Sequence, residues 1–304
     1  MGTFGGHALP GSFFIFFSLW AIYHILRRFY RRRAFELQIT EELVPKYVNR
    51  VSFPLECGST GCCKNRTIPL DSWLKFVACV IGIIGEVYTG FSSDWKFVHI
   101  GNAQHSTMFA TFGLSGIVEV LIFYRLLKTS IQVEYMFSLV ALLCEGFLFA
   151  FHLHGRTPVD VFLHMLLLGA ILISIVAGMF EVHNPDKPLF ALLRCWGLLV
   201  QGTWFWQVGA ILYPITYWMP RWDELAKQSM PRAANLFCYH LLIDFTAIVL
   251  LAAVMSYRIG RIKTSNLSRE ANFIYPPHTI DPESVELQED MNLHAVANTE
   301  ERAG

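Results

Sequence analysis

Acidic side chains and histidines recur inside the long apolar segments of this 304-residue chain. They are Glu86, His105, Glu145, His152, His154, Asp160, His164 and His240. A charge at the centre of a bilayer costs at least ~2.5–3.5 kcal/mol, so such residues face a protein interior or a wet cavity. If the segments bring these residues together, they form one chemical site.

Three of the histidines have the chemistry of a zinc site. Catalytic zinc takes three protein ligands and a water, and neutral imidazole is a common ligand. We expect His105, His164 and His240 to be the ligands, because they lie on three segments that run in the same direction. Glu86 or Glu145 would then serve as the general base or as a fourth ligand.

A further set of polar residues could orient those ligands through hydrogen bonds. The set comprises Asp160, Asp244, His152, His154 and Gln207. Two alternatives stay open. His164 and His240 could be axial ligands of a haem, or the histidines could only hold helices together.

The elements that must position these residues are membrane helices. The chain has a mean hydropathy of +0.41, with 54% hydrophobic and 16% charged residues, whereas soluble domains have ~25% charged residues. Seven apolar segments are long enough to cross a bilayer. They lie near residues 10–26, 73–91, 103–127, 133–152, 159–180, 189–213 and 233–259. The predicted fold is therefore an all-α polytopic membrane bundle of seven transmembrane helices.

An arginine-rich run after the first segment sets the predicted orientation. Residues 27–33 are mostly arginine, and basic flanks stay in the cytosol. The N-terminus is then outside or lumenal and the C-terminus cytosolic. The glycosylation sequons at Asn65 and Asn266 would both be cytosolic and unmodified.

This threading predicts a polar pocket in the outer half of the bundle. The residues of the proposed site fall within ~12 Å of one membrane face, at 1.5 Å per helical residue. Glu119 alone falls in the inner half, so it is the residue least expected in the site.

The remaining segments define the predicted domain plan. Residues 1–261 form the membrane domain, with a polar cytosolic loop at 27–72 and a disordered cytosolic tail at 262–304. Cys62 and Cys63 in the loop are either reduced thiols or palmitoylation sites. The net charge is zero and no basic, aromatic-rich helix is present, which argues against nucleic-acid binding.

Several motifs resemble the transmembrane protein 45 family, which includes the transmembrane epididymal proteins. The motifs are Gly6–Phe14, Gln104–Met108, Glu145–Phe149 followed by His152 and His154, and Gln201–Gln207. They carry His7, which the metal prediction leaves out. The resemblance implies a multi-pass membrane protein, in the secretory pathway or plasma membrane, and it implies no reaction.

Three functions follow as hypotheses. The polar pocket favours a metal-dependent hydrolase of lipid-like substrates that enter from the bilayer. The long polar tail favours a non-catalytic scaffold or trafficking adaptor, with the tail as the contact for protein partners. A proton-coupled transporter is the third, although no inverted repeat is visible.

Overall fold

The computed structural model describes residues 3–36, 47–56, 67–151, 153, 155–217 and 219–261. These residues form seven helices, which correspond one to one to the seven predicted segments. They are α1 (Phe4–Glu36), α2 (Leu70–Gly90), α3 (Ile100–Phe123), α4 (Ile131–Phe151), α5 (Pro158–His183), α6 (Pro188–Leu212) and α7 (Ser229–Ile259). A two-stranded antiparallel pair, β1 (Leu55–Glu56) and β2 (Thr67–Ile68), is a small exception to the all-α prediction.

Helix α1 extends beyond both predicted ends. It continues through the arginine run to Glu36, where the prediction has a loop from residue 27. Arginine is a good helix former, and Arg32 Nε lies 2.7 Å from Glu36 Oε1 one turn later. Pro10 lies inside the helix, in its second turn, where proline has no backbone N–H to donate to the carbonyl one turn earlier.

Helix α3 ends earlier than predicted, at Phe123 and not near residue 127. Arg125 adopts a φ of 57°, the left-handed conformation that commonly ends helices. The amide of Leu126 then donates to the carbonyl of Leu121. The terminus therefore depends on a backbone conformation that the hydropathy pattern does not encode.

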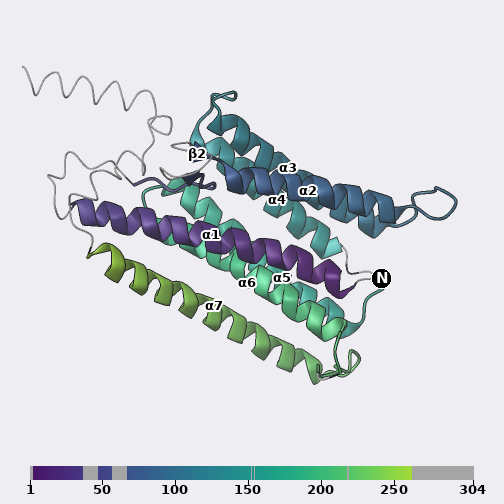
Figure 1. The fold of residues 1–304 in the computed structure, drawn as a ribbon. Helices are drawn as coiled ribbons and strands as arrows, with labels where there is room; N and C mark the ends of the chain where they lie inside the picture. The colour runs from purple at the N-terminus through teal and green to yellow at the C-terminus, as the bar shows by residue number, and fades with distance from the viewer. Residues whose placement is uncertain are drawn as a thin grey trace, which may run out of the picture.

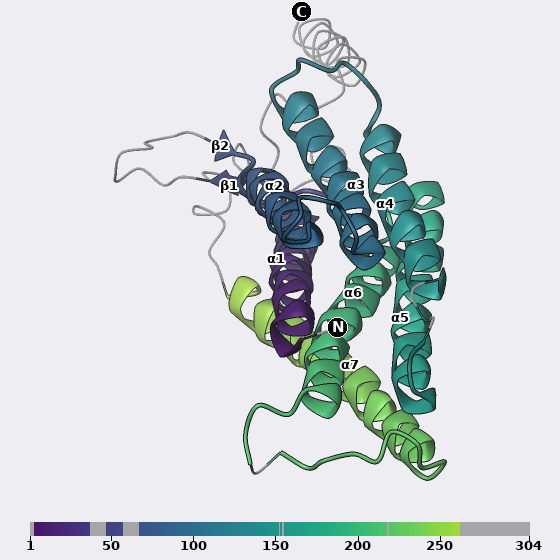
Figure 2. The ribbon, with the colours of Figure 1, turned by 90° about the vertical axis from the view of Figure 1, so that its right-hand side faces the viewer.

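Successive helices alternate in direction (Figure 1). The N-terminus, the α2–α3 loop and the α6–α7 loop lie at one end, called here the N-terminal end; the other is the opposite end (Figure 1). Helix α6 packs extensively against α1 and α5, and α2 against α3 (Figure 2). Helix α7 lies along the outside of α1 and α6.

The described part of the α1–α2 connection is packed onto the bundle. Tyr47, Asn49 and Phe53 are buried, although this stretch was predicted to be a polar loop. The Asn49 side chain donates to the carbonyl of Lys187 across 2.8 Å. The indole of Trp20 donates to the carbonyl of Phe53 across 3.0 Å. Residues 47–56 therefore form hydrogen bonds with both α1 and the α5–α6 turn.

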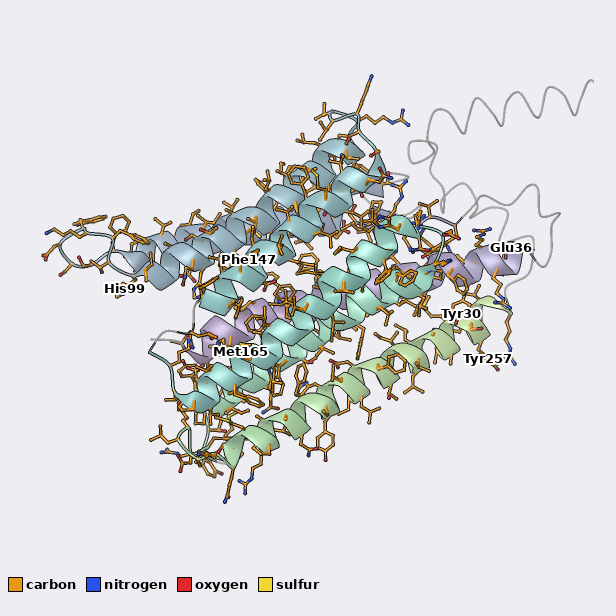
Figure 3. All side chains as sticks on the ribbon, turned by 180° about the vertical axis from the view of Figure 1, so that it is seen from behind. Tyr30, Glu36, His99, Phe147, Met165 and Tyr257 are labelled. Carbon is orange, nitrogen blue, oxygen red and sulfur yellow. The ribbon has the colours of Figure 1, made fainter. Side chains whose placement is uncertain are left out.

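The outer surface of the bundle is apolar. Large hydrophobic side chains such as Phe147 and Met165 point away from the core (Figure 3), and a soluble protein rarely exposes so much apolar surface. Helices α1, α3, α4, α5 and α7 are long and apolar enough to cross a membrane, while α2 and α6 fall short of that standard. The protein is a multi-pass membrane protein that contacts the lipid bilayer.

Candidate functional site

The best-defined polar cluster at the N-terminal end is centred on the first turns of α5. Thr157 caps the helix by accepting from the amide of Asp160. Asp160 and His164 follow one turn apart, with His164 Nδ1 2.8 Å from Asp160 Oδ1. Arg156 Nη1 contacts both carboxylate oxygens of Asp160, at 3.0 and 3.1 Å. Asp160 therefore already has two side-chain partners, the guanidinium of Arg156 and the imidazole of His164.

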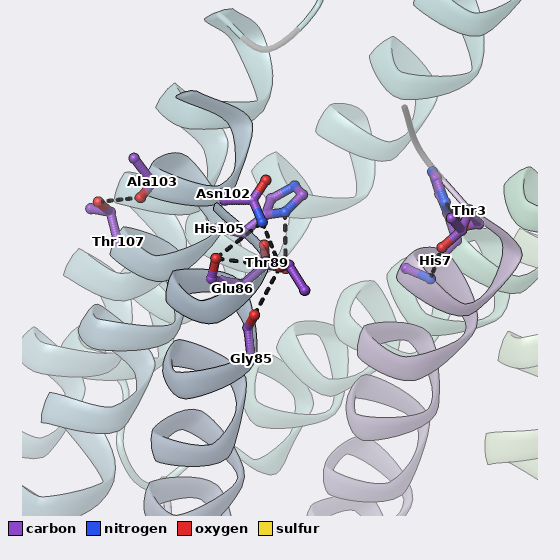
Figure 4. Close-up of polar contacts among 10 residues, drawn as sticks. Thr3, His7, Gly85, Glu86, Thr89, Asn102, Ala103, His105 and Thr107 are labelled. Carbon is purple, nitrogen blue, oxygen red and sulfur yellow. Dashed lines mark hydrogen bonds and ion pairs between the residues drawn. The ribbon is translucent and has the colours of Figure 1, made fainter. Parts of the chain in front are cut away.

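His7 of α1 completes this cluster, and sequence reasoning left it out of the metal prediction. Its ring lies 5.8 Å from that of His164, edge to face, and 5.5 Å from that of Tyr213. Its Nδ1 lies 3.0 Å from the carbonyl of Thr3, the contact drawn in Figure 4. Burial, with a further contribution from Asp160, raises the pKa of Tyr213 above its usual value. The only sequence signal for His7 was its place in the first family-like motif.

His105 lies in a separate contact between α2 and α3. Its Nδ1 is 3.2 Å from Glu86 Oε1. Asn102 Nδ2 donates to the carbonyl of Glu86 and to Thr89 Oγ1, at 3.1 and 2.8 Å. Figure 4 shows this group on α2 and α3, apart from His7 on α1. The predicted base Glu86 thus pairs with one predicted ligand at a partly exposed position.

His240 lies in a third contact, between α6 and α7. Its Nδ1 is 3.0 Å from Thr203 Oγ1, and that hydroxyl donates to Asp244 Oδ2 across 2.7 Å. Trp204 contacts the His240 ring at 5.4 Å and donates to the carbonyl of Leu163 across 3.0 Å. Asp244 therefore interacts with His240 through a hydroxyl group.

Glu145, the second predicted base, pairs with an amide at a fully buried position. Gln201 Nε2 of α6 donates to Glu145 Oε1 of α4 across 2.6 Å. Within the part of the chain that the structure describes, Glu145 Oε2 and Gln201 Oε1 have no hydrogen-bond partner. Gln207, two turns further along α6, makes no hydrogen bond to these groups within the described residues. The Glu145–Gln201 pair links α4 to α6.

The predicted metal ligands are thus divided among three interhelical contacts. Among the described residues, no group of three or more His, Cys, Asp or Glu is arranged to hold a metal ion. His152 and His154 lie outside the described residues. The zinc site remains a prediction, and these contacts do not favour it.

A polar network at the opposite end surrounds Glu119, the residue least expected in the predicted site. Ser72 Oγ of α2 donates to Glu119 Oε2 of α3 across 2.8 Å, and the Lys75 ammonium group pairs with Glu119 Oε1. Asp71 accepts from the amide of Phe53 across 2.5 Å. The hydroxyl of Ser115 lies 3.0 Å from the Lys75 ammonium nitrogen. Glu119 is therefore the centre of a buried network between α2 and α3.

A second buried network at that end joins three helices. Tyr135 of α4 donates to Glu181 Oε1 of α5 across 2.7 Å. Arg194 Nε of α6 donates to Glu181 Oε2 across 2.6 Å. The predicted segment near 159–180 ends one residue before Glu181, so the apolar pattern gave no signal for this network.

Comparisons with known proteins agree with the membrane architecture. Residues 131–257 match a family of unknown function (DUF716). The chain is similar to the transmembrane epididymal proteins. It is 22% identical to transmembrane epididymal protein 1 of Rattus norvegicus over 84% of this chain and 82% of that protein. It is 22% identical to transmembrane epididymal protein 1A of Mus musculus, with the same coverage of both chains.

The human relative matches over a shorter region. Transmembrane epididymal protein 1 of Homo sapiens is 24% identical over 49% of this chain and 54% of that protein. The resemblance seen in the sequence motifs is confirmed, and the similarity to transmembrane proteins supports the membrane assignment. The names of these relatives specify no reaction.

Proposed function

We propose that this chain is a non-catalytic membrane scaffold or trafficking adaptor, whose buried polar residues fix the helix packing. The observation that carries the proposal is that the predicted metal ligands and bases pair with other side chains. His164 pairs with Asp160, His105 with Glu86, and His240 with Thr203. The His105–Glu86 and His240–Thr203 pairs join neighbouring helices. The three histidines lie in separate contacts, so among the described residues they form no common set of metal ligands.

The remaining contacts support the same role. Glu145 with Gln201 links α4 to α6, and Glu181 links α4, α5 and α6. Interhelical hydrogen bonds stabilise membrane bundles, in which lipid gives little hydrophobic drive for helix association. Partner contacts would then come from the polar residues 262–304 and the α1–α2 connection.

The proposed placement in the membrane has all seven helices crossing it. Helix α6 is surrounded by α1, α5 and α7, and a helix shielded from lipid does not need a fully apolar surface. The arginine run at the end of α1 supports a cytosolic position for the opposite end. The N-terminus would then be outside or lumenal.

Proximity labelling in cells tests the adaptor proposal. The full chain is compared with a chain that ends at residue 261, both carrying the labelling enzyme on the C-terminus, which is the side proposed to be cytosolic. We expect the truncated chain to stay in the membrane and to lose its specific labelled neighbours or its localisation. Unchanged neighbours and localisation would reject the adaptor role. Turnover of a lipid ester or amide by purified protein, abolished by His164→Ala, would favour the hydrolase.

A further inference from the structure

The ends of α1 and α7 carry a dense group of arginines at the opposite end of the bundle. This group, the arginine patch, comprises Arg27, Arg28, Arg31, Arg32, Arg33, Arg258 and Arg261. Glu36 is the only acidic residue in the same helix ends, residues 27–36 and 255–261. The patch therefore has a strong positive charge.

The two helix ends lie side by side. Ala34 of α1 and Ile259 of α7 belong to one buried core, which also contains Leu26 and Met255. Both helices end on the same side of the bundle in Figure 1. Figure 3 shows Glu36 of α1 and Tyr257 of α7 at the same end of the bundle. Arginines that are distant in sequence thus gather at one corner of the bundle.

The patch lies at the depth of lipid headgroups. Helix α1 covers about 33 Å from Phe4 to Leu26, and α7 covers about 36 Å from Ala233 to Tyr257, at 1.5 Å per residue. The hydrocarbon core is about 30 Å thick. The arginines of both helices begin directly after these apolar lengths, so both sets reach the same polar layer.

The side chains are suited to phosphate groups. Arg33, Arg258 and Arg261 are exposed, and Arg261 stacks over Tyr257 at 4.1 Å, an amphipathic pair typical of the membrane interface. Arg32 is partly exposed beside Glu36. Guanidinium groups bind phosphate oxygens through paired hydrogen bonds. Arg28 lies over the Phe53 ring and is engaged with the protein, so the exposed members of the patch are those available to a ligand.

We propose that the arginine patch binds the headgroups of anionic phospholipids in the adjoining leaflet. Charge complementarity and headgroup depth select this ligand, because a soluble partner would have to reach arginines that lie beside the lipid. The binding depends on charge as well as on hydrogen bonds, so lysine should replace arginine in part and glutamine should not.

Lipid titration of the purified full chain tests the proposal. Phosphatidylserine and phosphatidylcholine are added separately in detergent, and bound lipids per chain are counted by native mass spectrometry. The test variant is Arg32→Gln/Arg33→Gln/Arg258→Gln/Arg261→Gln, and the same positions changed to lysine form the rescue variant. Arg221→Gln/Arg232→Gln, at the N-terminal end, is the control, and its loss of affinity is compared per arginine removed.

We expect phosphatidylserine to bind more tightly than phosphatidylcholine, and the glutamine variant to lose roughly fivefold in affinity for each arginine removed. The lysine variant and the control should keep most of the preference for phosphatidylserine over phosphatidylcholine. High salt should weaken this preference. Equal binding of both lipids would overturn the proposal, as would an equal loss in the control. Displacement of phosphatidylserine by inorganic phosphate would assign the patch to a soluble anion and also overturn it. Circular dichroism confirms that each variant is folded.

Discussion

Arg194 of α6 donates to Glu181 of α5 across 2.6 Å, and both side chains are buried. Replacing Arg194 with Met removes the cation and leaves the buried carboxylate with the Tyr135 hydroxyl as its one remaining partner among the described residues. We expect a loss of about 3–5 kcal/mol in stability, the usual cost of breaking a buried pair. Thermal unfolding in detergent measures it. Arg32→Met, which breaks the more exposed pair with Glu36, is the control and should cost less than ~1 kcal/mol.

The crossing of α1 and α6 depends on two glycines. A Cβ atom on Gly202 would lie 2.8 Å from the carbonyl oxygen of Gly11, closer than real Cβ contacts. Gly202→Ala should therefore push the helices apart and cost about 1–3 kcal/mol. Gly169→Ala on α5 is the matched control, because no atom lies within 4 Å of its Cβ position. Equal melting temperatures for the two variants would show that this close crossing is absent.

Glu119 should matter more to stability than Glu86. Glu119 is buried and pairs with both Ser72 and Lys75, whereas Glu86 pairs with His105 at a partly exposed position. Glu119→Gln leaves the ammonium group of Lys75 without its charged partner, so we expect a lower melting temperature than for Glu86→Gln. The opposite order would contradict the network described for α2 and α3.

The proposed orientation predicts that neither sequon carries a glycan. Asn65 and Asn266 would both face the cytosol, where N-glycosylation does not occur. The mobility of the full chain from mammalian cells should be unchanged by glycosidase treatment. A sequon introduced in the α2–α3 loop should be glycosylated and is the positive control. A glycan on either natural asparagine would reverse the orientation.

The helices could be predicted from the sequence because their apolar segments are long. The predicted segment near 189–213 agrees with α6 at Pro188–Leu212, and that near 159–180 with α5 at Pro158–His183. The end of α1 could not be predicted from hydropathy, because arginines that leave the hydrocarbon layer still form helix to Glu36. Hydropathy reports the environment of a segment, and helix ends depend also on propensity and capping.

The side-chain pairs of the candidate site were only partly predictable. Asp160 and His164 share a face one turn apart, and they do contact each other. The partner of Glu145 on α6, Gln201, depends on how two helices are rotated about their axes. The same rotation decides that His7 meets His164 while His105 does not. A single sequence gives depth along a helix, and it does not give this rotation.

Metal content tests the central claim most directly, which is that the polar residues link helices in separate contacts and share no metal. The full chain is purified without chelators, and zinc and iron per chain are measured by mass spectrometry. His105→Ala, His164→Ala and His240→Ala are measured in parallel. The account predicts no stoichiometric zinc or iron in the parent chain and no difference among the variants. One metal ion per chain, lost in all three variants, would contradict it.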